Sequence, residues 1–222
     1  MESTNQTCAT LIEELLVDPK GFYDSGRSYL LLQTFFDGAS LEMLRPLLMS
    51  NILFVQRVAV FVASELGSSV CGLLDNIAPL LCSNERYLQY HAMEIITICS
   101  IGDKTGAFLS VVRMLETHDE VLRILAMNLM SRTTLTKIIA ARNACTSDLP
   151  HAEAHQRGLG LLENLHLANA KIIEETIADE DPLVRRYGAI AAKRLEHIFS
   201  MVMKRMEASD DPDLRNFCGD ST

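Results

Sequence analysis

Residues 178–195 read ADEDPLVRRYGAIAAKRL, the pattern of a tight turn followed by an amphipathic helix. Asp181 is a suitable N-cap because its carboxylate can accept the free backbone N–H groups of a first helical turn. Pro182 suits the next position, where no N–H donor is needed. Small and aliphatic residues then recur at helical spacing on one face, among them Val184 and Gly188, so another helix can approach this face closely.

Related segments recur along the chain. The sequence DPDLRNFC begins at Asp211, 30 residues after Asp181. A second motif, RPLLMSN at 45–51, returns as APLLCSN at 78–84, an offset of 33 residues, and RMLETH at 113–118 fits the same frame. Small residues inside the predicted second helix of each unit keep step with these motifs: Gly26, Ala59, Ala92, Ala126, Gly158 and Gly188. A period of roughly 30–35 residues indicates an array of helical repeats.

The pattern predicts an all-α fold in which residues 1–222 form a single solenoid domain of about six helical hairpins. Residues 1–10 are expected to be a flexible tail before a short helix at 11–17, and 219–222 a disordered tail. The longest predicted loop inside the array, 145–150, is expected on a binding face. The predicted helices cover residues 21–36, 41–49, 53–66, 69–82, 85–101, 105–116, 120–130, 134–144, 151–165, 170–178, 182–197 and 198–208.

Composition limits the possible functions. Hydrophobic residues make up 48% of the 222 residues and aromatic residues 6%, with no Trp, which is typical of a helix-packed core. The net charge of −9 opposes binding to nucleic acid or anionic membranes and favours cationic partners. No uncharged apolar run reaches the ~18 residues of a membrane span, and the polar start of the chain does not resemble a signal peptide. We therefore expect a soluble, cytoplasmic protein.

Six cysteines stand at positions 8, 71, 82, 99, 145 and 218, with no C-x-x-C pair. Most of them fall on apolar helix faces, so we expect small buried hydrophobic residues in a reducing compartment. The spacing favours neither a zinc site nor a disulfide framework.

Two clusters suggest chemistry. His151 and His155 stand at i and i+4 on one helix face, a spacing able to hold zinc, but Glu153 between them points elsewhere and no third ligand is evident. Several carboxylates gather between Glu163 and Asp181, where helix capping and solvation explain them better than acid/base chemistry. No phosphate-binding loop or nucleophile motif is present. We therefore predict no catalytic residue, no metal site and no cofactor.

The helix pairs resemble HEAT repeats, whose first helices commonly bend at a proline, as Pro46 and Pro79 would bend theirs. The second helices of that family begin with Asp followed by Val-Arg and small residues. Asp179, Val184 and Arg185 match that pattern, Arg123 and Arg215 match it in part, and Gln89 and Gln156 depart from it. The resemblance covers nearly the whole chain and implies a right-handed α–α superhelix.

A narrower resemblance lies in the first third of the chain. The segments YLLLQTFFDG at 29–38, LEMLRPLL at 41–48 and ASELG at 63–67 are similar to small bacterial HEAT-repeat proteins encoded beside polymorphic or contact-dependent toxins. This resemblance implies a monomeric immunity protein, without enzymatic activity, that occludes a basic cognate toxin domain in a one-to-one complex. A general scaffold or adaptor is the first alternative, and a HEAT-fold DNA glycosylase or cofactor lyase is the second.

In a HEAT array the second helices line the concave face, and residues two before and two after each small core position should project from it. Tyr and Arg are the residue types most often found as interface anchors. The predicted partner-binding residues are Arg57, Tyr90, Glu94, Asn128, Gln156, Glu163, Arg186 and Lys193.

Overall fold

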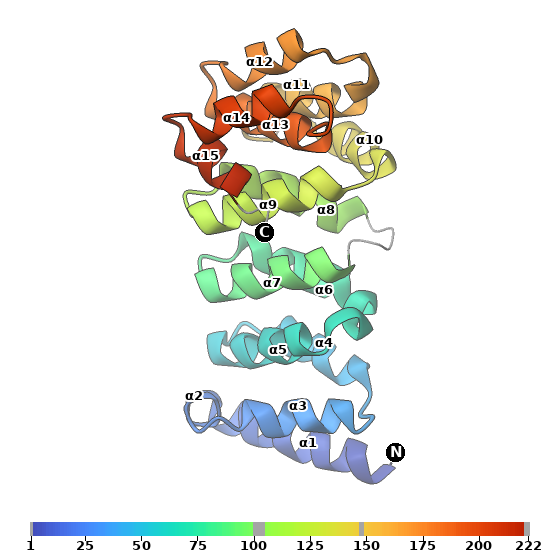
Figure 1. The fold of residues 1–222 in the computed structure, drawn as a ribbon. Helices are drawn as coiled ribbons and strands as arrows, with labels where there is room; N and C mark the ends of the chain where they lie inside the picture. The colour runs from blue at the N-terminus through green and yellow to red at the C-terminus, as the bar shows by residue number, and fades with distance from the viewer. Residues whose placement is uncertain (1, 100–104, 147–148, 220–222) are drawn as a thin grey trace. The chain divides into compact units, whose positions relative to one another are not determined.

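The computed structural model describes residues 2–99, 105–146 and 149–219, and every regular element in these ranges is helical (Figure 1). This confirms the all-α prediction. The chain divides into two compact units, Met1–Gly102 and Asp103–Thr222, called unit 1 and unit 2 below. That both units act as the single domain expected from the sequence stays a prediction.

Unit 1 consists of short α-helices joined by turns and 3₁₀ segments. Its elements are α1 (Glu2–Val17), α2 (Pro19–Asp24), α3 (Ser28–Phe36), η1 (Leu41–Leu44), α4 (Arg45–Leu48), α5 (Leu53–Glu65), η2 (Gly67–Leu73), α6 (Leu74–Ile77), η3 (Ala78–Cys82) and α7 (Arg86–Cys99). Pro46 and Pro79 lie in the first positions of α4 and η3, where the helix type changes, since proline fits a helix start and disrupts a helix interior.

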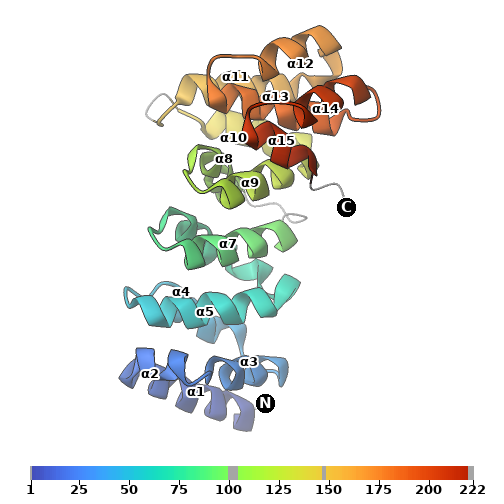
Figure 2. The same ribbon diagram turned by 60° about the vertical axis from the view of Figure 1, so that its left-hand side comes forward.

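Packing in unit 1 follows chain order. Helix α3 packs on α1, α5 packs on α3, and α7 packs on α5, a succession visible in both ribbon views (Figures 1 and 2). The core between them is aliphatic and includes the fully buried Leu31, Val58 and Met93. Ala59 and Ala92 are also fully buried, as predicted for small residues that allow close helix packing.

Two predictions for unit 1 are wrong. Residues 2–10 are helical because α1 packs its apolar face inward: Cys8 is fully buried, and the Asn5 Oδ1 atom accepts the Ser40 backbone N–H at 3.0 Å. The predicted helix at 21–36 is interrupted by Gly26, whose φ of 72° belongs to a turn. Gly26 is therefore a turn residue and not a helix-packing residue.

The cysteine prediction is corrected at three positions. Cys71 and Cys99 form a disulfide, with a Cα–Cα distance of 5.2 Å, because η2 packs against α7 and brings together residues 28 apart in sequence. Cys82 is exposed. The remaining cysteines, Cys8, Cys145 and Cys218, are buried and form no disulfide, as predicted.

Unit 2 contains α8 (Thr105–Arg113), η4 (Met114–Glu116), α9 (Glu120–Arg132), α10 (Leu135–Ala144), α11 (Ala152–Glu163), η5 (Leu165–Leu167), α12 (Ala170–Ile177), α13 (Pro182–Arg194), α14 (Ser200–Glu207) and α15 (Pro212–Gly219). Asp181 caps α13 by accepting the Leu183 N–H at 2.8 Å, and Pro182 follows it, as predicted. The predicted loop at 145–150 is described except at 147–148. The predicted disordered tail lies outside the described residues at 220–222, while Gly219 ends α15.

Packing in unit 2 does not simply follow chain order. Helix α13 packs against α11 and α12 but also against α9, and α15 packs against both α9 and α13 (Figure 1). An ideal repeat array joins each repeat only to its neighbours. In unit 2 the last helix instead returns to one that precedes it by about 90 residues, as the Arg123–Asp213 hydrogen bonds show.

One turn geometry recurs before α9, α13 and α15. In unit 2 a Ser, Thr or Asp side chain accepts the N–H two residues later, and an arginine six residues after it donates back to its carbonyl oxygen. The three arginine bonds are Arg123 to Thr117 at 2.8 Å, Arg185 to Asp179 at 3.0 Å and Arg215 to Ser209 at 3.0 Å. In unit 1 the corresponding Gln56 and Gln89 bond the Leu48 and Leu81 carbonyls at 3.4 and 3.2 Å.

Two glycines in unit 2 allow very close packing. A Cβ atom at Gly158 would lie 2.1 Å from the ring of the fully buried Tyr187, and one at Gly188 would lie 2.9 Å from Ile177. Both positions therefore require the absence of a side chain, as the recurring small residues predict. Among the residues described, no helix is long and apolar enough to cross a membrane.

Candidate functional site

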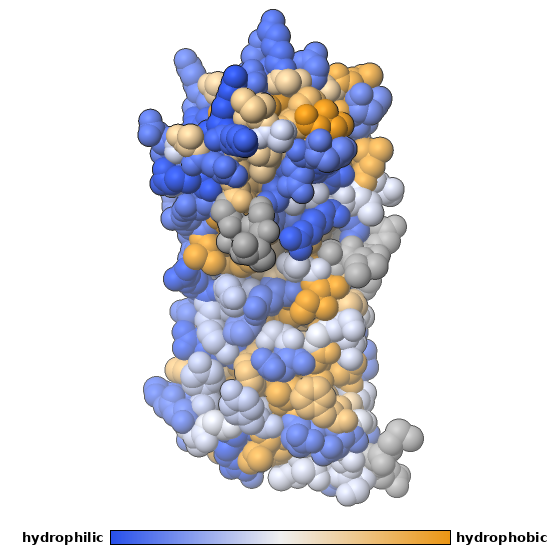
Figure 3. Space-filling view, in the orientation of Figure 1, coloured by the Kyte–Doolittle hydropathy of each residue, from blue (hydrophilic) through white to orange (hydrophobic). Residues whose placement is uncertain are grey.

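Aromatic side chains gather on one surface of unit 1, called the aromatic surface below. It is formed by Tyr23 of α2, Tyr29 of α3, Phe54, Arg57 and Phe61 of α5, and Tyr87, Tyr90 and His91 of α7. Tyr29 is 66% exposed and Tyr90 38% exposed. Figure 3 shows apolar and near-neutral residues interrupting the hydrophilic surface over α3, α5 and α7.

The rings of the aromatic surface contact one another across helices. Tyr23 lies against Phe54, with ring centroids 5.6 Å apart, and meets Tyr87 edge-on at 6.4 Å. The Tyr87 ring in turn meets the His91 ring at 4.5 Å. Edge-to-face pairs of this kind stabilise ring orientation, so the aromatic surface is held in place before any partner binds.

Arg57 sits at the centre of the aromatic surface. Its guanidinium lies 5.4 Å from the Phe54 ring centroid and 5.8 Å from that of Tyr87. It also pairs with Glu85 at 2.7 Å, which joins α5 to the start of α7. The predicted binding residue Arg57 is therefore half-buried and oriented by three neighbours.

Tyr90, His91 and Glu94 form the far end of the aromatic surface. The Glu94 carboxylate raises the pKa of Tyr90, with a smaller contribution from burial. Burial lowers the pKa of His91 more than the Glu94 and Glu65 carboxylates raise it, so the imidazole is neutral at neutral pH. Glu94 Oε2 lies 3.1 Å from His91 Nδ1. The predicted residues Tyr90 and Glu94 thus lie together, and their role in binding stays a prediction.

The five predicted binding residues of unit 2 do not form a comparable surface. Gln156 donates to the Arg142 carbonyl at 2.9 Å, and Glu163 pairs with Arg142 at 2.5 Å, so both brace α11 against α10. Lys193 lies over the Phe217 ring at 5.6 Å, and Asn128 is half-buried on α9. For these residues, as for Arg186 below, binding stays a prediction.

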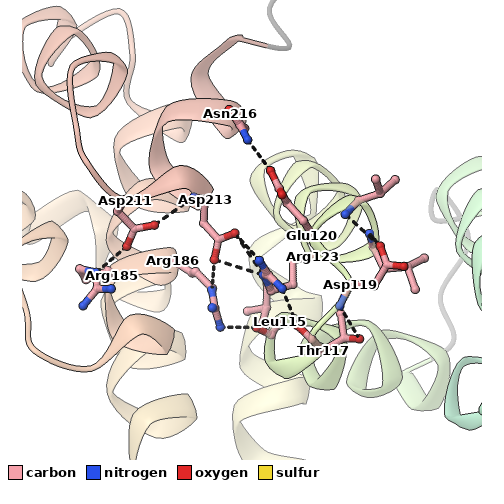
Figure 4. Close-up of polar contacts among 12 residues, drawn as sticks. Leu115, Thr117, Asp119, Glu120, Arg123, Arg185, Arg186, Asp211, Asp213 and Asn216 are labelled. Atoms are coloured by element: carbon pink, nitrogen blue, oxygen red, sulfur yellow. Dashed lines mark hydrogen bonds and ion pairs between the residues drawn. The ribbon is translucent and has the colours of Figure 1, made fainter.

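Arg186 belongs to a buried ionic cluster centred on Asp213 of α15 (Figure 4). The Asp213 side chain is 6% exposed and pairs with Arg123 of α9 at 2.7 Å and with Arg186 of α13 at 2.8 Å. Arg186 also donates to the Leu115 carbonyl at 2.6 Å. Burial raises the pKa of Asp213, but the hydrogen bonds from Arg123 and Arg186 outweigh it and hold the pKa below its ordinary value. The guanidinium of Arg186 is thus occupied within the fold.

The two histidines of the predicted pair, His151 and His155, lie in different surroundings. His155 is buried, with Nδ1 2.8 Å from the Tyr187 hydroxyl and Nε2 2.6 Å from Glu116 Oε1. His151 is exposed at the start of α11, and its Nε2 lies 3.9 Å from Glu116. Within residues 2–99, 105–146 and 149–219, no three His, Cys, Asp or Glu side chains are placed to hold a metal ion. His155 instead links three segments of unit 2.

Most aromatic residues of this surface were not among the binding residues predicted from the sequence. Register from the small core positions indicated Arg57, Tyr90 and Glu94, but not Tyr23, Tyr29, Phe54, Phe61 and Tyr87. One signal could have found them: four of the five tyrosines fall between positions 23 and 90. Because the chain has few aromatic residues, this concentration of tyrosines in its first half indicates an aromatic surface there.

Comparison with known proteins assigns no family. No protein-family model matches the chain, and no curated protein matches it. A crystal structure of an engineered protein is similar at a TM-score of 0.46 and 14% identity. That similarity covers 85% of this chain and 58% of the engineered one, so the chain spans less than two thirds of its length.

Proposed function

We propose that this protein binds another protein through the aromatic surface of unit 1 and that it acts as an immunity protein against a basic toxin domain. The observation that carries the binding role is the cross-helix array of Tyr23, Arg57 and Tyr87, with the partly exposed Tyr90 joined to it through the His91 ring. Tyr and Arg dominate the energetics of protein interfaces because they combine large contact area with hydrogen bonding. Rings already fixed by their neighbours lose little conformational entropy on binding.

Charge supports a basic partner. Residues 1–102 carry eleven Asp and Glu and five Lys and Arg, a net charge of −6. Lys20, Arg27, Arg45 and Arg57 are already paired with carboxylates of the same unit. An acidic excess of this kind accelerates association with a basic protein by electrostatic steering. Toxins that cleave nucleic acids are often basic, which agrees with the resemblance to immunity proteins.

The finer architecture is part of the same proposal. We infer HEAT-like hairpins, about six in number, arranged as a right-handed α–α superhelix that binds its partner in a one-to-one complex. The support is the recurring turn, in which the arginine at 123, 185 and 215 bonds the carbonyl six residues earlier. A geometry repeated at the same place before several helices is expected of a repeat family.

The test is affinity purification of the tagged protein from cells that carry its native locus, with mass spectrometry of the bound proteins at moderate salt. We expect one product of a neighbouring gene in one-to-one ratio, and rescue of growth when that product is expressed. Tyr90→Ala should weaken the complex by about 30-fold or more, as removal of an interface anchor does.

The matched control is Met201→Ala, which removes an exposed apolar side chain from α14 of unit 2. This variant should bind as the unmodified protein does. Recovery of several unrelated proteins without an effect on growth would support a scaffold and overturn the immunity role. Equal loss of binding in both variants would overturn the assignment of the aromatic surface.

A further inference from the structure

Four aromatic rings of unit 1 line an open pocket of about 410 Å³. The rings are Tyr23 of α2, Tyr29 of α3, Phe61 of α5 and Tyr87 of α7, and Asp24 stands beside them in the lining. Each of four helices thus contributes one aromatic ring to the pocket. Its shape therefore depends on how the helices of unit 1 pack and not on a single loop.

The rings are held edge to face. Tyr29 and Phe61 have centroids 5.1 Å apart at an interplanar angle of 73°, and Tyr23 and Tyr87 have centroids 6.4 Å apart at 87°. Perpendicular pairs leave ring faces available to a bound group. Burial, with the neighbouring Tyr23 hydroxyl, raises the pKa of Tyr87 to about 12, so its hydroxyl stays protonated and uncharged near neutral pH.

Phe54, beside the pocket, and Tyr87, in its wall, already contact cations. Lys20 Nζ lies 5.7 Å from the Phe54 ring centroid, and Arg57 lies over both Phe54 and Tyr87. Within unit 1 these cations are paired with Asp24 and Glu85 respectively. The pocket therefore combines aromatic ring faces and phenolic oxygens with the negative net charge of unit 1. Together these favour binding of a cation over a neutral or anionic group.

We propose that this pocket receives an arginine side chain of the protein partner, an inference that rests on the proposed binding function of the aromatic surface. A guanidinium is planar and weakly hydrated, so it stacks on ring faces while its N–H groups donate to hydroxyl and carboxylate oxygens. The Tyr23, Tyr29 and Tyr87 rings offer both kinds of contact. An ammonium group, being compact and strongly hydrated, gains less from such a pocket.

The experiment uses small probes and needs no partner, so its outcome is independent of whether a toxin is found. The full chain is labelled with ¹³C in the tyrosine rings, and the five tyrosine signals are assigned by Tyr→Phe substitutions. Nα-acetyl-arginine methylamide is titrated against Nα-acetyl-citrulline methylamide, which has nearly the same shape without the charge. The signals of Tyr23, Tyr29 and Tyr87 should shift with the arginine probe, saturating in the range of about 1–10 mM.

The citrulline probe should bind at least about fivefold more weakly, since it lacks the cation that interacts with the rings. Tyr187, fully buried in unit 2, is the internal reference and should not shift. Tyr29→Leu should reduce binding of the arginine probe about fivefold, because Tyr29 is exposed and its ring walls the pocket. Leu30→Ala is the matched control: it changes the next residue of α3, also exposed and absent from the pocket, and should leave binding unchanged.

Equal binding of arginine and citrulline, or normal binding by Tyr29→Leu, would overturn the pocket assignment. Equally tight binding of Nα-acetyl-lysine methylamide would overturn the choice of a guanidinium. Arginine binding to a protein that captures no neighbouring-gene product would leave the pocket standing and sink only the immunity role.

Discussion

At Gly158 the absence of a Cβ atom allows the close packing of unit 2. The Tyr187 ring occupies the space where a Cβ atom would lie, at 2.1 Å, and its hydroxyl is fixed by His155 at 2.8 Å. Gly158→Ala should therefore lower the free energy of unfolding by about 1–3 kcal/mol, as overpacking of a core does. Chemical denaturation followed by circular dichroism would measure this loss.

Gly160→Ala provides the control in the same helix. A Cβ atom there meets Arg142 at 3.6 Å, an ordinary contact. Alanine favours a helix interior over glycine by up to about 1 kcal/mol, so this variant should be as stable as the original protein or more so. Equal destabilisation by both substitutions would show that α11 tolerates no side chain for reasons unrelated to Tyr187.

Asp213 is the residue whose charge matters most to unit 2. Asp213→Asn leaves Arg123 and Arg186 without their shared carboxylate and should cost about 3–5 kcal/mol, the usual penalty for breaking a buried ion pair. Asp210→Asn, a change at an exposed position of the preceding turn, should lie within about 0.5 kcal/mol of the original. Urea denaturation at neutral pH would separate the two variants.

The same carboxylate predicts a pH dependence. Because the folded-state pKa of Asp213 is lowered, its contribution is present above the unfolded-state pKa of about 3.9 and is lost as pH falls through the lower folded-state value. Unfolding free energies measured from pH 6 down to pH 2 should thus fall less steeply in Asp213→Asn than in the original protein. Parallel curves would contradict the assigned role of Asp213.

At the scale of the element, the turn before α13 sets the start of that helix. Asp181→Ala removes the acceptor of the Leu183 N–H and should lower stability by about 0.5–2 kcal/mol. Glu180→Ala is the control at the preceding residue. The hydrogen bond that Arg185 donates to residue 180 goes to the backbone carbonyl, which this substitution keeps, so stability should change by less than about 0.5 kcal/mol. Thermal unfolding of both variants tests the difference, and a loss in Glu180→Ala as large as in Asp181→Ala would rule out the cap.

Much of the element level could be predicted because its signals are local. The Asp181 cap and the start of α13 depend on residues close in sequence. The departure of Gln89 from the arginine pattern was also visible, but only the structure shows that this glutamine, like Gln56, bonds a carbonyl eight residues back in place of arginine. The aromatic surface was harder to predict, since its rings meet across helices whose relative rotation no local signal fixes.

At the scale of the whole molecule, the disulfide should stabilise unit 1 selectively. Closing a loop of 28 residues between Cys71 and Cys99 corresponds to about 3–4 kcal/mol of chain entropy. The double variant Cys71→Ser, Cys99→Ser should therefore speed amide hydrogen exchange in α5 and α7 and leave α9 and α13 unchanged. Cys82→Ser, at a free and exposed position, is the control.

Acceleration throughout both units would show that they unfold as one body and would contradict this selectivity. The disulfide was not predictable from spacing, because no local motif links the two cysteines and only the packing of η2 on α7 brings them together. Disulfides persist mainly in oxidising compartments, so this one weighs against the reducing environment inferred from composition.

The ionic cluster at Asp213 also bears on synthesis. A ribosome adds about 5–20 residues per second, so the carboxylate emerges roughly 5–20 seconds after Arg123, which precedes it by 90 residues. During that interval Arg123 lacks its acceptor, joined by Arg186 only for the last 27 residues of synthesis, while unit 1 is already complete. Unit 1 can therefore finish folding first on the ribosome, and the closure of α15 onto α9 is the late event of biogenesis.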